Sequence, residues 1–217
     1  MTSAALPDLL KWSVQNSEAS RQNADVPIAA PPSEGLAALL GFHVGSDAER
    51  MADNLLIVKN AAGDIGLEDR IKAFEDFRML VEKLDNANNL PNIQQYKGGP
   101  RGLWTPLLEQ LNSEDVEIRS LAASCCHAAV QNDIKAQEKL LTVGGIPTLV
   151  QLATTDPNKD VRKRAIRALN STAQNYQPAL DDIIAHLPDT HKPKDKIDAA
   201  DADSLLSWRT ALESQLT

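Results

Sequence analysis

One internal repeat constrains the fold of this 217-residue chain more than any other feature. Between Leu103 and Leu187 the sequence follows the same pattern twice, with corresponding residues about 43 positions apart. In each copy a proline stands near the start of an expected helix, and apolar residues then recur at helical spacing. Five pairs mark the offset: Ile118 with Val161, Ala122 with Ala165, Gln131 with Gln174, Asn132 with Asn175, and Ala136 with Ala179.

The length of this repeat predicts the architecture. A period of roughly 40 residues lies in the armadillo and HEAT range, where each unit is two or three helices. One unit cannot bury its apolar stripe alone, whereas stacked units share a continuous core. Aromatic residues are scarce, at 4%, which suits the packing of helix on helix. We therefore predict an all-α, armadillo/HEAT-like helical solenoid whose concave face is free to bind a partner.

The chain divides into three predicted parts. Residues 1–32 contain a short amphipathic helix at 6–15 and then a flexible, disordered linker rich in Ser, Asn, Gln, Ala and Pro. Residues 33–190 form the repeat domain. Residues 191–217 form a tail whose last helix, expected at 202–216, caps the end of the stack.

The first repeat is expected to be degenerate. Helices are predicted at 33–40, after Ser46, and at 66–84, where apolar residues form a single stripe. The polar run at 85–89 is expected to close the last of these helices. Residues 94–101 carry two glycines and a proline between helical units, so we predict an inserted surface loop there.

Charge and cysteine content narrow the possible functions. The net charge is −8 and the pI is about 5.0, which argues against nucleic acid as a partner. Cys125 and Cys126 are neighbours within a helical pattern, so we expect two small buried residues without a disulfide, as in a reducing compartment. No secretory signal and no stretch of membrane-spanning length is seen, so neither export nor a membrane is expected.

No catalytic or metal-binding pattern is present in the sequence. The four histidines are His43, His127, His186 and His191, and Pro188 separates the last two, so they do not form a helical metal pair. Ser and Asp residues form no nucleophile elbow, and the carboxylates fall on expected solvated faces, caps and turns. We expect no enzyme, no metal and no cofactor.

Recurring polar residues on the inner helices are the best candidates for a docking strip. Arg119 and Arg162 recur at the repeat offset, but each could instead pair with a neighbouring acid to fix its own repeat. Gln131 with Asn132, and Gln174 with Asn175, could likewise cap the ends of their helices. The candidate concave-face residues are Asn86, Asn88, Arg119, Gln131, Asn132, Arg162, Arg167 and Asn175.

Five motifs in order resemble a known family, the fungal armadillo-type nucleotide exchange factors for the heat shock protein 70 chaperone. Together they cover nearly the whole chain outside the linker. The motifs are Leu9-Leu10-Lys11-Trp12-Ser13-Val14-Gln15-Asn16-Ser17, Asp85-Asn86-Ala87-Asn88-Asn89-Leu90, Gly102-Leu103-Trp104-Thr105-Pro106-Leu107, Ala128-Ala129-Val130-Gln131-Asn132 and Asn175-Tyr176-Gln177-Pro178-Ala179-Leu180.

This resemblance implies a function without catalysis. Members of the family clasp one lobe of the chaperone's ATPase domain, open its nucleotide cleft, and so promote the release of ADP and of the bound client protein. The resemblance also implies a cytoplasmic monomer, with a nuclear pool left open. In the family the N-terminal motif acts as a substrate-like release segment, and here its candidate residues are Leu9, Leu10, Trp12, Ser13 and Asn16.

The sequence also departs from the family pattern. Ser124 stands where the family usually has Trp and His127 where it has Gly, so we expect altered packing on the second helix of a central repeat. Gln174 stands where the family has Arg, and we expect the loss of this contact to weaken affinity. The loop at 94–101 is not part of the pattern. The alternative function is a general armadillo-type adaptor that holds extended peptides in its groove. Against it, Trp12, Trp104 and Trp208 do not recur at the repeat spacing.

Overall fold

The computed structural model describes residues 45–131 and 133–216, and its regular elements there are helices. This confirms the all-α prediction. The helices predicted at 6–15 and 33–40, and the predicted boundary at residue 33, lie outside the described residues. The elements are α3 (Asp47–Lys59), α4 (Leu67–Val81), α5 (Leu84–Asn89), α6 (Trp104–Glu109), η1 (Gln110–Asn112), α7 (Val116–Val130), α8 (Ile134–Thr142), α9 (Gly145–Thr155), α10 (Lys159–Ala173), α11 (Gln177–His186), η2 (Asp189–His191) and α12 (Ala202–Leu216).

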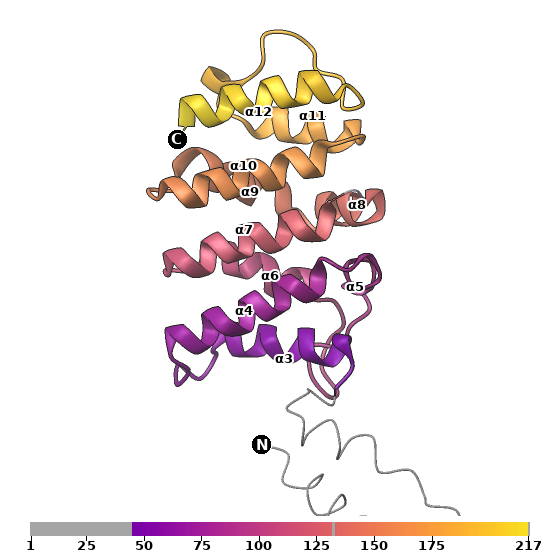
Figure 1. The fold of residues 1–217 in the computed structure, drawn as a ribbon, viewed down its shortest axis with the longest axis vertical. Helices are drawn as coiled ribbons and strands as arrows, with labels where there is room; N and C mark the ends of the chain where they lie inside the picture. The colour runs from indigo at the N-terminus through magenta and orange to yellow at the C-terminus, as the bar shows by residue number, and fades with distance from the viewer. Residues whose placement is uncertain (1–44, 132, 217) are drawn as a thin grey trace, which may run out of the picture. The chain divides into compact units, whose positions relative to one another are not determined.

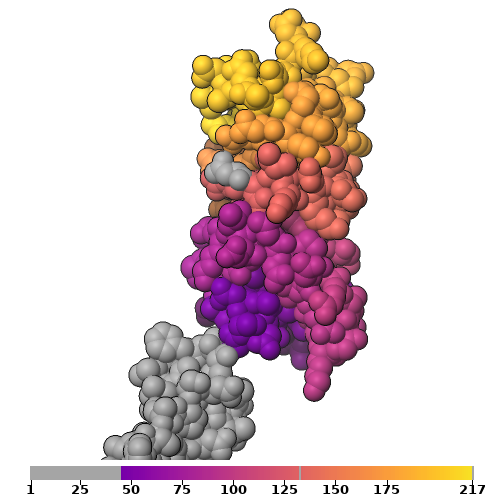
Figure 2. All heavy atoms as spheres, turned by 90° about the vertical axis from the view of Figure 1, so that its right-hand side faces the viewer, coloured from indigo at the N-terminus to yellow at the C-terminus, as the bar shows by residue number. Residues whose placement is uncertain are grey.

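Asp47–Thr217 forms one compact unit in which these helices stack in chain order (Figure 1). One row consists of α4, α7, α10 and α12, each packed against the next, and α3, α6, α9 and α11 pack against this row. In Figure 2 the colours follow one another along the stack, as expected when each layer touches only its neighbours. The predicted solenoid is confirmed.

The two clean repeats contain corresponding helices. In the first, α6, α7 and α8 follow one another, and α9, α10 and α11 follow in the same order in the second. A turn precedes the second helix of each repeat, ahead of Val116 and Lys159. Gly144 lies between α8 and α9 with φ +74°, the left-handed conformation that ends a helix and suits glycine.

Small side chains allow the central helices to pack on two sides. Because α7 lies between α4 and α10, it buries residues on most of its circumference, including Ala122, Ala123 and Ala129. Cys125 and Cys126 are buried among them and form no disulfide. Burial raises the pKa of the Cys126 thiol to about 12, so these cysteines act in packing, as the sequence predicts.

The first repeat differs from its prediction. The helix expected at 66–84 ends at Val81, and the polar run expected to close it is itself a short helix, α5. Its Asn86 side chain donates to the carbonyl of Leu80 at 2.9 Å and to Asp47 Oδ2 at 3.0 Å. These bonds stabilise a helical turn that has almost no apolar stripe of its own. The loop predicted at 94–101 is confirmed as a surface turn with a single bridge between Gln94 and Arg101.

A ladder of arginines joins successive layers, and we call Arg70, Arg119 and Arg162 the arginine ladder. Each lies in the first turns of α4, α7 or α10. Arg70 Nη1 lies 2.7 Å from Asp115 Oδ2, just before α7, and Arg119 Nε lies 2.7 Å from Asp156 Oδ2, before α10.

The same arginines also bind carbonyl groups. Arg119 donates to the carbonyls of Ser113 and Glu114, which precede its own helix. Arg162 makes the equivalent bonds to Asp156 and Pro157, and its Nε reaches the carbonyl of Leu216 at the end of α12. Arg119 and Arg162 therefore link the turn before their own helix to the next layer, whereas Arg70 links the Val58 carbonyl of α3 to Asp115.

The last helix closes the apolar core at the C-terminal end. α12 spans 202–216 as predicted, packs on α10, and buries Leu205, Trp208 and Leu212. The segment between α11 and α12 arches past these helices at the end of the stack (Figure 1). It is tied down by Asn175 N, which donates to the Ala199 carbonyl at 2.8 Å, and by Gln177, whose side chain bonds Ile197 and Ala199.

Candidate functional site

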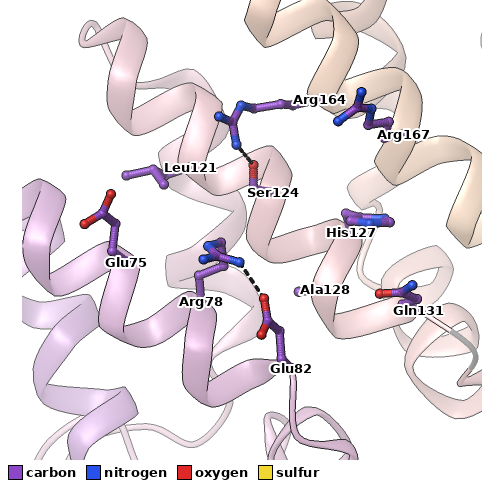
Figure 3. A pocket seen from close by; sticks show the side chains of 10 residues that line it. All are labelled: Glu75, Arg78, Glu82, Leu121, Ser124, His127, Ala128, Gln131, Arg164 and Arg167. Carbon is purple, nitrogen blue, oxygen red and sulfur yellow. Dashed lines mark hydrogen bonds and ion pairs between the residues drawn. The ribbon is translucent and has the colours of Figure 1, made fainter.

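A hollow of about 380 Å³ spans three successive helices of the solenoid, α4, α7 and α10 (Figure 3). We call it the central hollow. It opens where side chains of the three helices leave space between them. Its lining consists of Glu75, Arg78 and Glu82 from α4 and its C-cap, Leu121, Ser124, His127, Ala128 and Gln131 from α7 and its end, and Arg164 and Arg167 from α10.

Helical spacing explains why these side chains share one face. On α4, Arg78 follows Glu75 by three residues and Glu82 follows Arg78 by four, which places them one above another. The lining residues of α7 are three or four apart in the same way, as are Arg164 and Arg167 on α10. Since the other faces of α7 are packed against its neighbours, this is the strip it leaves for the hollow.

Hydrogen bonds across the hollow hold its side chains in place. Arg78 pairs with Glu82 along α4, and Arg164 Nη1 donates to Ser124 Oγ at 2.6 Å from the next layer (Figure 3). His127 Nδ1 lies 2.8 Å from the hydroxyl of Ser171 on α10. The contacts from α7 to α10 thus order the surface before any partner arrives.

The hollow is locally cationic although the chain is acidic overall. Three arginines line it against two glutamates, while the net charge of the chain is −8. Arg167 is exposed and has no ion pair or hydrogen bond with any described residue, so its charge is available to a partner. Burial, and then the nearby Arg167 and Arg209, lower the pKa of His127, so its neutral form is favoured. The surface is suited to a partner that presents carboxylates.

Two of the predicted docking residues line this hollow, Gln131 and Arg167. Both side chains are exposed. Asn132 lies outside the described residues, as do the N-terminal candidates Leu9, Leu10, Trp12, Ser13 and Asn16.

The remaining predicted residues lie away from the central hollow. Arg119 and Arg162 belong to the arginine ladder, which is the alternative role that the sequence left open for such an arginine. Asn86 and the half-buried Asn88 lie on α5. Asn175 follows α10 in the left-handed conformation, with φ 59°.

Several lining residues were not among the predicted docking residues. Glu75, Arg78, Glu82 and Arg164 were not proposed, and Ser124 and His127 were noted only as departures from the family pattern. The repeat offset could have indicated part of this set, because it relates Arg167 to Ser124 and Arg164 to Leu121. The residues of α4 carry no such signal, since the first repeat does not follow the later pattern.

The arrangement supports binding. Within the described ranges 45–131 and 133–216, no cluster of three or more His, Cys, Asp or Glu side chains is placed to hold a metal ion. Over the same ranges, no helix has the length and apolarity needed to cross a membrane. The lining of the hollow is mainly polar, and the Arg78–Glu82 and Arg164–Ser124 contacts hold four of its side chains in place.

Comparison with known proteins identifies two matching families. Residues 6–90 match the family described as nucleotide exchange factor Fes1, and residues 105–202 match HEAT repeats. Among curated relatives named Hsp70 nucleotide exchange factor FES1, that of Gibberella zeae is 43% identical over 94% of this chain and 93% of its own length. The Coccidioides immitis protein is 38% identical over 91% and 92%, respectively. The Saccharomyces cerevisiae protein is 33% identical over 88% and 67%.

Proposed function

Because this chain belongs to the family of Hsp70 nucleotide exchange factors named FES1, we propose that it releases ADP from a heat shock protein 70 chaperone by binding its ATPase domain. The observation that carries the proposal is the central hollow, a prearranged cationic surface that spans three layers of the solenoid. The factor acts by binding and needs no catalytic group. It must only bind the open, nucleotide-free chaperone more tightly than the closed one.

The surface chemistry is consistent with this role. An exposed arginine on a well-ordered surface often contributes to binding free energy. Its planar guanidinium pairs with carboxylates and loses little conformational entropy when it does so. Arg167 meets this description, and Arg164 is already oriented by Ser124. The large contact area expected from three helices would let the factor hold the open form of its partner.

The test is the rate at which a fluorescent ADP analogue leaves a purified cytosolic heat shock protein 70. Wild-type protein at micromolar concentration should accelerate this release. The double variant Arg164→Ala with Arg167→Ala should need a concentration roughly tenfold higher for the same rate, as for the loss of interface arginines. The matched control is Lys97→Ala with Lys135→Ala, which removes two exposed cations outside the hollow.

Two outcomes would count against the proposal. If the wild-type protein leaves ADP release unchanged, the function is wrong. If it accelerates release but both double variants behave alike, the function stands and the docking surface lies elsewhere. Circular dichroism would confirm that all variants remain helical.

The N-terminal segment is proposed to act on the client instead of on ADP. Leu9 and Trp12 give a short apolar motif, and it falls within the region matched to the exchange-factor family. A tethered segment reaches a nearby groove at high effective concentration. Leu9→Ala with Trp12→Ala should leave ADP release intact and slow the release of a labelled client. Equal loss of both activities would contradict this division of labour.

We further propose that the protein is a cytoplasmic monomer without enzymatic activity. The two free, buried cysteines suit a reducing compartment. The general peptide-binding adaptor is less well supported, because Trp104 and Trp208 are both buried and so offer no ladder of aromatic side chains to an extended peptide. A pull-down that compares a chaperone ATPase domain with a basic peptide library would discriminate the two functions.

A further inference from the structure

A half-buried histidine, His127, lines the central hollow with one ring nitrogen fixed and the other unused. Nδ1 lies 2.8 Å from the hydroxyl of Ser171 on α10. Nε2 bonds no described residue and is not among the buried atoms that lack a partner, so a docked protein can reach it. A fixed imidazole at a surface is the arrangement in which histidine titrates in response to its surroundings.

The Ser171 hydroxyl can hold this ring in both of its charge states. A hydroxyl group donates and accepts, and its hydrogen rotates to suit the partner. It can therefore donate to Nδ1 of the neutral ring and accept from Nδ1–H of the imidazolium. Because Ser171 is buried, this bond is sheltered from water. The ring of His127 can thus keep its place in the hollow whether or not it carries a charge.

Two arginines and one glutamate act electrostatically on His127. Among the described residues these are Arg167 of α10, Arg209 of α12 and, with the opposite sign, Glu82 at the end of α4. Arg209 Nε lies 3.8 Å from Glu213 Oε1. Within the same residues, α5, α6, α8 and η1 also pack against α7 but bring no charge that acts on the ring. Burial, and then the two arginines, lower the pKa of His127, so the free protein favours the neutral ring.

The other charges of the lining do not neutralise this end of the hollow. They are Glu75, Arg78 and Arg164. Arg78 is paired with Glu82, and Glu75 lies at the opposite end of the hollow from His127 (Figure 3). Arg167 forms no ion pair with any described residue. The positive charge beside His127 is therefore left for a docked partner to balance.

From this arrangement we propose that His127 makes docking at the central hollow proton-linked: a carboxylate of the chaperone binds beside Arg167 and His127, and the imidazole takes up a proton. The inference rests on the proposed function and adds a condition to it. The docked carboxylate offsets the repulsion from Arg167 and accepts a hydrogen bond from Nε2–H, so the charged ring becomes favourable. Because the complex then holds more protons than the separate proteins, binding strengthens as the pH falls.

The direct test measures proton uptake when the full 217-residue chain binds a purified, nucleotide-free heat shock protein 70. Calorimetric titrations at about pH 7, in two buffers of different ionisation enthalpy, give the number of protons taken up. The wild type should take up more protons than His127→Gln, which can still bond Ser171 but does not titrate. Equal uptake by the two proteins, or a smaller uptake by the wild type, would overturn the proposal.

A matched control is available in His186. This histidine is exposed and lies outside the hollow, so His186→Gln should take up as many protons as the wild type on binding the chaperone. If His186→Gln lowers the uptake as much as His127→Gln does, the proton does not go to the hollow and the proposal is wrong.

The dissociation constant should change with the same sign. Between about pH 8 and pH 6, the Kd of the wild type for the chaperone should fall several-fold more than that of His127→Gln. A single proton limits this difference to about tenfold per pH unit. If the ratio of the two Kd values is the same at every pH, His127 does not link docking to protons.

A further measurement needs no chaperone. In the free protein, a nuclear magnetic resonance titration follows the carbon-bound ring protons of His127. Arg167→Gln should raise the pKa of His127, because burial stays and the repulsion from Arg167 is gone. Lys135→Gln removes an exposed cation outside the hollow and should leave this pKa unchanged. No rise with Arg167→Gln would refute the electrostatic basis of the linkage.

These measurements separate the inference from the proposed function. If the chaperone binds and ADP release accelerates without proton uptake at His127, the proposed function stands and the linkage is wrong. If the chaperone does not bind at all, both are wrong.

Discussion

At the scale of single residues, Asp156 is the most enclosed carboxylate of the arginine ladder. Its side chain is only 2% exposed, and that of its partner Arg119 is 12% exposed. Two nitrogens of Arg119 bind its two oxygens, at 2.7 and 3.3 Å. Removing one partner of such a pair leaves the other charge buried without compensation, which costs more than the pair itself contributes.

The first prediction concerns this pair. Arg119→Ala should lower the free energy of unfolding by about 3 kcal/mol, because Asp156 loses its counter-ion in a buried position. Lys72→Ala is the control, since it breaks the fully exposed pair with Glu68 on the surface of α4 and should leave the urea midpoint nearly unchanged. Similar midpoints for the two variants would show that the ladder contributes little to stability.

The second prediction concerns pH. Burial and the charges of Arg167 and Arg209 lower the pKa of His127, with Glu82 opposing them. Between this lowered pKa and the ordinary value of about 6.5, the unfolded chain binds more protons than the folded chain, so stability falls as the pH falls. His127→Gln removes this titration and can still bond Ser171. The wild type should therefore lose more unfolding free energy than the variant between about pH 7.5 and 5.5.

Chemical denaturation at both pH values, with the same buffer ions, measures this difference. Because the other histidines are present in both proteins, subtraction isolates His127. Parallel pH profiles, or a larger loss in the variant, would contradict the predicted sign.

For single residues, the sequence showed which positions recur between repeats but did not show which groups those residues contact. Arg119 and Arg162 stand at equivalent positions, yet one meets a carboxylate and the other the terminal carbonyl of α12. Their partners lie in another layer, far away in the sequence. The local residue pattern around each arginine does not indicate which partner it will meet.

At the scale of elements, the junction between α8 and α9 depends on one backbone conformation. Gly144 has φ +74°, and a Cβ built there would meet no heavy atom within 4 Å. A side chain at position 144 would therefore destabilise the fold through the backbone conformation that it disfavours, and not through a steric clash. The described residues other than glycine with positive φ are Asn60 and Asn175, so asparagine already adopts this conformation elsewhere in the chain.

The third prediction follows from this junction. Gly144→Ala should lower the free energy of unfolding by about 1 kcal/mol, because alanine disfavours the left-handed region. Gly144→Asn should cost clearly less. Thermal unfolding followed by circular dichroism would rank the three proteins. If alanine and asparagine have equal effects, the backbone strain is not the cause.

Element by element, the sequence predicted the helices whose apolar stripes repeat. The last helix, α12, begins and ends where its pattern indicated. The pattern failed at α5, where an Asn-rich run forms a helix because Asn86 bonds Leu80 and Asp47. Such a helix depends on side-chain bonds to other elements, and propensity and periodicity do not reveal them.

At the scale of the whole molecule, the proposed exchange reaction obeys reciprocity. If the factor weakens ADP binding to the chaperone about 100-fold, the coupling is about 2.7 kcal/mol, and ADP must weaken factor binding by the same ratio. This fourth prediction is checked by titrating the factor into nucleotide-free and ADP-saturated chaperone in a calorimeter. A factor affinity that ADP leaves unchanged, alongside accelerated ADP release, would mean that the effect is kinetic only.

The site was less predictable than the fold because its lining depends on how whole helices pack against one another. The central hollow draws residues from three helices, and which strip of α7 stays open depends on how α4 and α10 pack on its other sides. The repeat offset relates positions in two layers and says nothing of α4. Recurrence alone therefore favoured Arg119 and Arg162 of the arginine ladder, which join successive layers.

The arginine ladder also bears on how such a chain can grow. The unit of α6 and α7 and the unit of α9 and α10 each contain an arginine that reaches forward, Arg119 or Arg162, and an aspartate that receives the arginine behind it, Asp115 or Asp156. A tandem duplication of one unit would thus supply both halves of each new joint, and neither neighbour would have to change. At α12 the ladder differs, because Arg162 donates to the carbonyl of Leu216 instead of to a carboxylate.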